Sequence, residues 1–163
     1  MSRAFVKEDG PDNAPLPDLP ISPHPNYVTP RGLALLQAAL AEAQARLTAL
    51  RARAERLDRL PEAAAERDIR YLEARLKSAI PLSSDGRSCD EVGFGHRIRV
   101  ADENGSEVAY TIVGEDEADA SRGLIAPQSP LARALMGARV GDLVVWRKPA
   151  GQVDLEILEI SWP

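Results

Sequence analysis

The apolar positions of residues 30–81 repeat in alternating steps of three and four. The repeat begins after Thr29-Pro30, is interrupted at Pro61 and stops at Pro81. Such heptads predict two helices that face each other across a proline turn, an antiparallel coiled-coil hairpin. The same pattern would also serve pairing between chains, so a dimer zipper is an alternative. The predicted seam consists of Leu33, Leu36, Leu40, Ala43, Leu47, Leu50, Ala54, Leu57, Ala65, Ile69, Leu72, Leu76 and Ala79.

From about residue 90 the apolar period changes to two, which predicts strands. Ile98 and Val100 alternate with polar residues as far as Asn104-Gly105, and a second alternating run of Val108, Tyr110 and Ile112 follows. An Asn-Gly pair between two such runs is a strong signal for a hairpin turn.

Two further strands are predicted near the C-terminus. Leu143–Trp146 is the first, and a turn at Pro149–Gly151 separates it from the second. In the second strand the alternation changes phase between Ile157 and Leu158, which predicts a bulge or bend. An antiparallel sheet with one short helix is of the α+β kind.

The short helix is predicted within "SPLARALMGARVGD", residues 129–142. Ser129 is a good N-cap, and Pro130 suits the first helical position, where no donor is needed. Leu131 and Leu135 lie four residues apart on one face. Gly137 can adopt the left-handed conformation that ends a helix.

Seven of the thirteen prolines lie in residues 1–30, which lack a helical period. We interpret residues 1–29 as a proline-rich flexible tail. The alternative is an arm laid against the body and anchored by Phe5, Ile21 and Tyr27. The chain would then divide into this tail, the hairpin at 30–81 and a small domain at 82–163.

The composition of the chain indicates which partners it can bind and in which cellular compartment it works. The net charge of −5 disfavours binding to free DNA or RNA, because phosphate contacts require a basic face. Cys89 is the single cysteine, so no intramolecular disulfide forms. The start lacks the apolar run of a signal peptide, and no apolar stretch is long enough to cross a membrane. A cytoplasmic protein is expected.

The sequence contains no convincing catalytic or metal-binding constellation. His24 and His96 lack the spacing of metal ligands, and Cys89 has no evident base beside it. We therefore expect no catalytic residue, no metal site and no cofactor. Glu115, Asp116, Glu117 and Asp119 do not match a calcium loop and are interpreted as a solvated acidic turn.

The turn of the predicted hairpin also carries acidic residues. Asp58, Glu62 and Glu66 could present Mg²⁺ at the end of a rod. Arginines surround them, so we favour salt bridges over metal binding. These arginines are Arg51, Arg53, Arg56, Arg59 and Arg67.

Several segments together resemble the GreA/GreB family of bacterial transcription elongation factors. They cover about residues 29–160, and the C-terminal ones are the most specific. The Trp in "VVWRKPAG" is also similar to Rnk, a relative with a short coiled coil. The matching segments are "TPRG" at 29–32, "RDIRYLEARLKSA" at 67–79, "YTIVGEDEAD" at 110–119, "SPLARALMGARVGD" at 129–142 and "PAGQVDLEILEI" at 149–160.

The resemblance implies an FKBP-like C-terminal domain that docks at the rim of the RNA polymerase secondary channel, with the coiled coil entering the channel. It places Ser129 and Pro130 on the docking surface, and we expect Leu131 and Arg133 of the same short helix to contribute. Nucleic acid would be met only within the elongation complex. A monomer without membrane contact is expected.

The tip departs from the family pattern. The resemblance implies an Asp and a Glu in D-x-x-E-N, which help hold a catalytic Mg²⁺, whereas this chain reads "LDRLPEAAAER" at 57–67. Asp58 and Glu62 are four residues apart and no Asn follows. The hairpin also looks about two turns per arm shorter, which withdraws the tip by about 10 Å. A misplacement of 1 Å can cost about a hundredfold in rate.

We therefore expect a non-enzymatic polymerase-binding factor with weak or no stimulation of transcript cleavage. One alternative is a genuine cleavage factor whose tip carboxylates, Asp58 and Glu62, bring Mg²⁺ to the polymerase active site. Another is a structural adaptor that pairs through its heptads. Prolyl isomerase activity is disfavoured, because the chain has few aromatic residues to line such a pocket.

Overall fold

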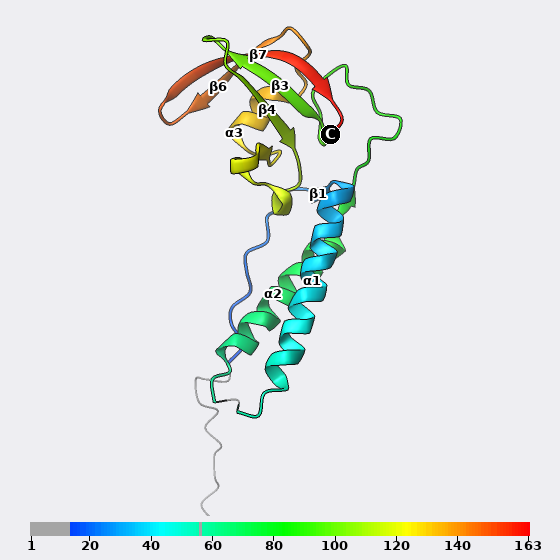
Figure 1. Cartoon of the computed structure of the whole chain (residues 1–163), viewed down its shortest axis with the longest axis vertical. Coiled ribbons are helices and arrows are strands. Elements are labelled where there is room, and N and C mark those ends of the chain that lie inside the picture. The colour runs from blue at the N-terminus through cyan, green and yellow to red at the C-terminus, as the bar shows by residue number, and fades with distance from the viewer. Residues whose placement is uncertain (1–13, 56) are drawn as a thin grey trace, which may run out of the picture. The chain divides into compact units, whose positions relative to one another are not determined.

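The computed structural model describes residues 14–55 and 57–163 (Figure 1). Within these residues the chain forms two compact units. One comprises residues 14–24 and 36–77, and the other comprises residues 25–35 and 78–163. The first turns of the first helix thus group with the C-terminal unit, whereas the sequence placed the boundary after residue 81. Phe5, named as a possible anchor, lies outside the described residues.

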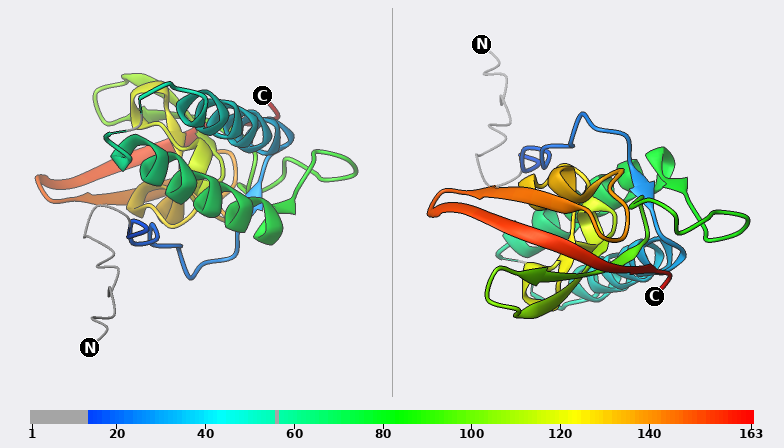
Figure 2. Two further views of the ribbon diagram at one scale, coloured as in Figure 1. Left: turned by 90° about the horizontal axis from the view of Figure 1, so that it is seen from below. Right: turned by 90° about the horizontal axis from the view of Figure 1, so that it is seen from above.

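The first unit contains most of two helices, α1 (Pro30–Arg51) and α2 (Leu60–Ser78). They lie side by side and run in opposite directions (Figures 1 and 2). Leu36, Ala43 and Ala65 are buried on the predicted seam. Ion pairs join the helices at Arg46–Asp68, 2.9 Å, and Arg51–Glu66, 2.6 Å.

The first helix is shorter than its heptad pattern predicts. It ends at Arg51, and both Ala54 and Leu57 are exposed, Leu57 by 95%. A seam position is buried only where the partner helix faces it, and α2 does not begin until Leu60. The apolar repeat of residues 54–57 therefore continues into the turn without a partner. Pro61 lies in the first turn of α2, where its missing N–H costs nothing.

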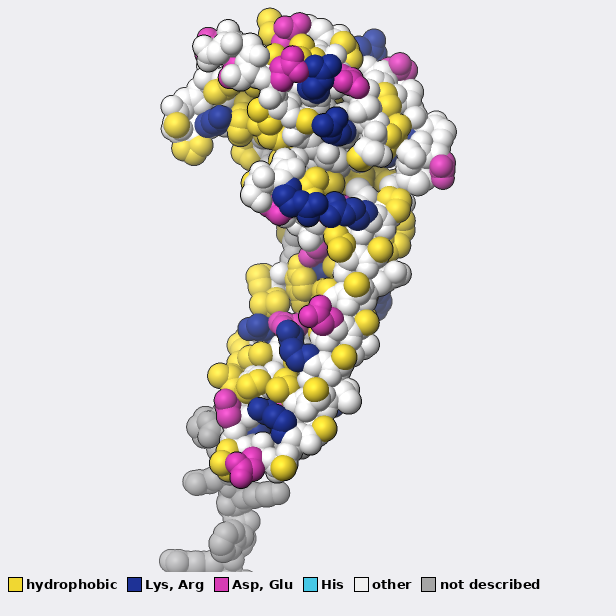
Figure 3. Space-filling view, viewed as in Figure 1, with side chains coloured by type: hydrophobic (Ala, Val, Ile, Leu, Met, Phe, Trp, Pro, Cys, Tyr) yellow, Lys and Arg dark blue, Asp and Glu magenta, His cyan; other side chains and the backbone are white. Residues whose placement is uncertain are grey.

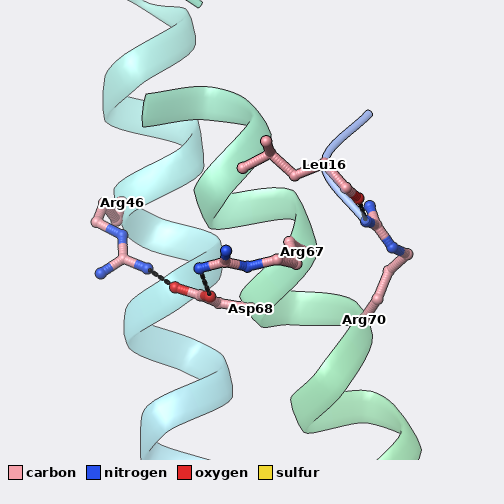
Figure 4. A network of polar contacts seen from close by, with 5 residues as sticks. All are labelled: Leu16, Arg46, Arg67, Asp68 and Arg70. Atoms are coloured by element: carbon pink, nitrogen blue, oxygen red, sulfur yellow. Dashed lines mark hydrogen bonds and ion pairs between the residues drawn. The ribbon is translucent and has the colours of Figure 1, made fainter. Parts of the chain in front are cut away.

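Residues 14–24 lie along α2 as an arm (Figure 1), and Leu16 of this arm lies beside Arg70 of α2 (Figure 4). Arg70 donates from Nε to Asp18 Oδ1 at 2.6 Å and from a terminal nitrogen to the Leu16 carbonyl at 2.9 Å. Leu16 and Leu19 are half-buried, whereas Ile21 is 48% exposed. The leucines, and not Ile21, are thus the apolar contacts of this segment.

The second unit begins with β1 (Tyr27–Val28), which pairs in parallel with β2 (Ile80–Pro81). A curled five-stranded sheet follows, with strand order β5-β4-β3-β7-β6. Its strands are β3 (Arg97–Asp102), β4 (Glu107–Ile112), β5 (Leu124–Ile125), β6 (Leu143–Lys148) and β7 (Gly151–Ser161). All pairs are antiparallel except β4–β5, which is parallel. The sequence predicts a purely antiparallel sheet, and this prediction is wrong for the β4–β5 pair.

The predicted change of phase in the last strand is a β-bulge. Arg99 pairs with Glu159, but the next residue, Val100, pairs with Ile157, so Leu158 is left between them. The bulge keeps both Ile157 and Ile160 on the buried face, because it shifts the alternation by one residue.

The core of this unit lies between the sheet and α3 (Pro130–Leu135), which packs against β6. Two short 3₁₀ helices, η2 (Glu115–Glu117) and η3 (Ala120–Arg122), connect β4 to β5. Among the described residues of this unit, the side chains that are almost wholly buried are aliphatic with one exception, His96. The most buried of these aliphatic residues are Ile98, Val100, Ile112, Leu135 and Ile157.

Candidate functional site

Helix α3 carries the residues expected to bind a partner. The Ser129 hydroxyl accepts from the Ala132 N–H at 3.2 Å, and Pro130 occupies the start of the helix, so the predicted cap is confirmed. Gly137 follows the helix with φ of +79°, as the predicted stop requires. Pro130 is exposed at the start of α3, where it can meet another molecule.

The four expected contact residues divide between surface and core. Pro130 and Arg133 are exposed, and Ser129 is half-buried. Leu131 is only 4% exposed and belongs to the core cluster, so its expected role as a contact is wrong. A six-residue helix has one apolar face, and Leu131 and Leu135 both lie on it, directed at the sheet.

The acidic side chains at the turn between α1 and α2 contact other residues of the same chain. The Asp58 carboxylate accepts from the Leu60 N–H at 2.9 Å and so caps the start of α2. Glu62 is 4% exposed, and it is one of the residues that have an interaction partner. Glu66 pairs with Arg51. Figure 3 shows basic and acidic side chains interspersed along this unit, which agrees with the expectation of salt bridges.

The acidic stretch after β4 is interpreted from the sequence as a solvated turn, but one of its side chains is buried. Glu117 has a side chain only 4% exposed, and its carboxylate accepts from the Thr29 hydroxyl. Arg31 lies 3.7 Å from the other carboxylate oxygen. A negative charge at this helix N-terminus is favourable, because the first backbone N–H groups of α1 are unpaired there.

Gly32 provides the room that Glu117 occupies. A Cβ atom at Gly32 would lie 2.7 Å from Glu117 Oε2, closer than side chains approach. Thr29 accepts from the Gly32 N–H at 2.9 Å, so it caps α1 and binds Glu117 at once. The glycine in the first helical turn was the available sequence signal for this contact, since glycine is unfavourable inside a helix without a packing reason.

Asp119 occupies a different environment, at the start of η3. Its carboxylate accepts from the hydroxyl and the N–H of Ser121, at 2.6 and 3.0 Å. The hydroxyl contact is the main reason that the pKa of Asp119 is lowered. Asp119 is therefore a charged turn residue that caps a local helix.

His96 is buried beside Trp162, with the two rings 4.4 Å apart and edge to face. Its Nδ1 accepts from the Gly93 N–H at 2.9 Å. Burial, and then the positive charge of Arg87, lower the pKa of His96. The imidazole is thus neutral at pH 7 and takes part in the packing of the domain. Residues 14–55 and 57–163 contain no group of three or more His, Cys, Asp and Glu side chains placed to hold a metal ion.

A cavity of about 510 Å³ lies in the second unit near the start of α1. Leu82, Val113 and Leu124 give it apolar walls, and Trp162 is the one aromatic ring among its described lining residues. An isomerase pocket with several aromatic walls is therefore not formed there. None of the helices in the described part of the chain is both long and apolar enough to span a bilayer.

Comparison with known proteins connects this domain to a family. Residues 87–162 match the family model for "Transcription elongation factor, GreA/GreB, C-term". This range contains the sheet and the capped helix α3. This domain is therefore similar to the C-terminal domain of the GreA/GreB family. The family-model match begins at Arg87, after both helices of the hairpin.

Relatives named "Transcription elongation factor GreA" are similar to part of the chain. That of Nitratidesulfovibrio vulgaris is 40% identical over 98 residues, which are 60% of each chain. That of Thermoanaerobacter pseudethanolicus is 44% identical over 93 residues, 56% of this chain and 59% of the relative. The chain thus spans about 60% of the length of these curated GreA proteins.

Two solved structures of this family are similar over more of the chain. The GreA factor homolog 1 (Gfh1) protein of Thermus thermophilus is 23% identical, with 85% of this chain and 99% of that chain covered and a TM-score of 0.40. The GreA/GreB factor of Nitrosomonas europaea is 21% identical, with 84% and 99% covered and a TM-score of 0.43.

Proposed function

We propose that this protein binds bacterial RNA polymerase at the entrance of its secondary channel and regulates transcription elongation there. The observation that carries the proposal is the exposed Pro130 at the capped start of α3, within a domain that matches the GreA/GreB family model. The cap holds the Pro130 ring in a fixed position, so a partner would meet a preformed surface.

In this proposal the C-terminal unit is an FKBP-like docking domain, and the helical hairpin is a coiled coil that enters the channel. One copy of the chain acts on each polymerase, in the cytoplasm and away from membranes. Nucleic acid is met only inside the complex, because the net charge of −5 gives free DNA or RNA no favourable field.

We further propose that the protein is not an enzyme, has no cofactor of its own, and stimulates transcript cleavage weakly or not at all. The support comes from the turn of the hairpin. Asp58 caps α2 and Glu62 is buried with a partner, so neither carboxylate is free to hold Mg²⁺ in the described conformation. Metal ligation would require both to give up their present contacts.

Two other functions make different use of the same residues. A genuine cleavage factor would use Asp58 and Glu62 to bring Mg²⁺ to the polymerase active site. A structural adaptor would pair its heptads between chains. The ion pairs Arg46–Asp68 and Arg51–Glu66 join α1 and α2 within one chain, which favours the folded hairpin over the adaptor.

A backtracked elongation complex with Mg²⁺ tests the proposed function. Added protein should change the rate of elongation or pausing while the RNA 3′ end keeps its length. Shortening of the RNA that disappears in an Asp58→Ala, Glu62→Ala double variant would establish the cleavage factor instead. Glu73→Ala, an exposed carboxylate elsewhere on α2, is the matched control. No effect of the protein on any step would contradict the proposal.

A further inference from the structure

Strand β6 lies at one edge of the five-stranded sheet, and β7 is its one partner strand among the described residues (Figure 1). The Ile157 N–H donates to the Asp142 carbonyl at the start of this pair. Backbone groups alternate in direction along an antiparallel strand. The backbone N–H and C=O groups of Val144, Trp146 and Lys148 therefore point to β7. Those of Leu143, Val145 and Arg147 point to the free edge.

The first four residues of this edge strand, Leu143–Trp146, are apolar. Leu143 is 75% exposed and Val145 is 47% exposed. Edge strands usually carry a charge, a proline or a bulge that prevents pairing with another chain. The stretch Leu143–Trp146 has none of these, and the ladder with β7 is regular along it.

The charges at the two ends of β6 are complementary to each other. Asp142 immediately precedes the strand, and Arg147 and Lys148 end it. If a second β6 runs antiparallel with Val145 opposite Val145, then Asp142 of each copy lies opposite Lys148 of the other. Opposite charges in directly facing positions stabilise a strand pair.

The same register also suits the side chains and the backbone. It places Val144 opposite Trp146 on the inner face, where each is already half-buried against the core. Leu143 faces the aliphatic stem of Arg147 on the outer face. The residues that point to the free edge then face one another, as a hydrogen-bonded ladder requires.

We propose that the free protein forms a twofold-symmetric dimer through β6, with the twofold axis at Val145. This goes beyond the proposed function and concerns the chain when it is not bound to polymerase, where a monomer was expected. Symmetric pairing through one shared patch is the commonest form of homodimer. Six residues per copy form a small interface, so the dimer is weak and its population depends on concentration.

Sedimentation velocity over a wide concentration range tests the proposal, with Val145→Pro as the central variant. Proline removes the N–H that points to the free edge and leaves the ladder with β7 intact, since edge strands tolerate proline there. The variant should dimerise about tenfold or more weakly, because the symmetric pair loses two backbone hydrogen bonds. Val145→Thr keeps the N–H and is the matched control. Circular dichroism verifies the fold of each variant.

Two further variants keep the test decisive if proline disturbs the fold. Lys148→Glu places like charges opposite each other and should weaken the dimer severalfold, whereas Lys148→Arg should not. In a Cys89→Ser background, Val145→Cys should form a disulfide-linked dimer under mild oxidation, because hydrogen-bonded strand neighbours have Cα atoms about 5.5 Å apart. Val108→Cys, exposed on β4, is the control.

The outcomes separate this proposal from the other forms of the chain. A wild-type protein that stays monomeric at every concentration would overturn it. So would a dimer that Val145→Pro and Lys148→Glu leave unchanged, as pairing through the helical heptads would. Polymerase binding by the Val145→Pro variant is measured separately, so a failure of the dimer leaves the proposed function untouched.

Discussion

The carboxylate of Glu117 accepts a hydrogen bond from the hydroxyl group of Thr29, the residue that caps helix α1. This contact connects residues 88 positions apart. It joins the segment "TPRG" at 29–32 to the acidic stretch at 115–119, two of the segments on which the family resemblance rests. The two segments thus have a shared structural role, because the buried Glu117 carboxylate binds the residue that caps the start of α1.

The Thr29–Glu117 contact predicts that Gly32→Ala destabilises the protein. The added methyl group would meet Glu117 Oε2 at 2.7 Å, and moving that oxygen breaks the bond to Thr29. We expect a loss of about 1–2 kcal/mol in the free energy of unfolding. Urea denaturation measures it. Helix propensity alone would give the opposite sign, a gain of about 1 kcal/mol.

A double-mutant cycle identifies the cause of that loss. Glu117→Ala removes the atom that the new methyl group meets, so Gly32→Ala should cost less in the Glu117→Ala background than in the wild type. An equal cost in both backgrounds would show that Glu117 does not fill the space over Gly32.

The cap of α3 and its contact role can be separated at Ser129. Ser129→Ala removes the acceptor for the Ala132 N–H and should cost about 1 kcal/mol of stability. Ser129→Gly should cost only a few tenths. Thermal unfolding compares the two variants. A loss in Ser129→Gly as large as in Ser129→Ala would argue against capping as the source.

The buried His96 predicts a pH dependence of stability. Burial and Arg87 lower its pKa in the folded state below the ordinary value of 6.5, so the unfolded chain binds a proton more readily. Stability is therefore full above pH 6.5 and falls as the pH drops through that value toward the folded pKa. Unfolding measured between pH 7.5 and about 5 should show this slope.

Substitution of the histidines tests the source of the slope. His96→Gln retains an acceptor for the Gly93 N–H and removes the titration, so the slope near pH 6 should flatten. His24→Gln alters an exposed histidine and should leave the slope as it is. A slope that disappears in the second variant and persists in the first would contradict the assignment.

The arm along α2 depends on Arg70, which contacts both Asp18 and the Leu16 carbonyl. Arg70→Lys retains the charge and loses the two-pronged geometry. The free energy of unfolding should change by less than about 1 kcal/mol, because both ends of the ion pair are exposed. Limited proteolysis within residues 14–24 should nevertheless accelerate several-fold. Arg46→Lys, in a different ion pair of this unit, should not alter cleavage there.

Local patterns in the sequence predicted much of the sheet domain, since each depends on neighbouring residues. The turn at Asn104-Gly105, the start of α3 and the bulge at Leu158 follow from glycine conformations, capping and alternation. The end of α1 could not be predicted in this way. The heptad pattern continues beyond Arg51, but these residues form a helix only where a second helix packs against them. Helix α2 begins at Leu60, and that start is set by the conformation of the turn.

In the candidate site, too, the features set by neighbouring residues could be predicted and those set by distant contacts could not. Exposure of Pro130 follows from its place at the start of a capped helix, whereas the burial of Leu131 depends on how α3 lies on β6. Glu117 was read as solvated because its partner Thr29 is distant in sequence. Side-chain contacts between remote segments leave only indirect signals, such as the glycine at position 32.

Direct binding to core RNA polymerase tests the central claim. Labelled protein is titrated with the polymerase and compared with Pro130→Asp, which keeps α3 folded because an acidic residue is favourable in a first helical turn. Pro149→Asp, in the exposed turn between β6 and β7, is the control. The account predicts saturable binding by the wild type and Pro149→Asp and its loss in Pro130→Asp. Equal binding by all three, or binding by none, would contradict it.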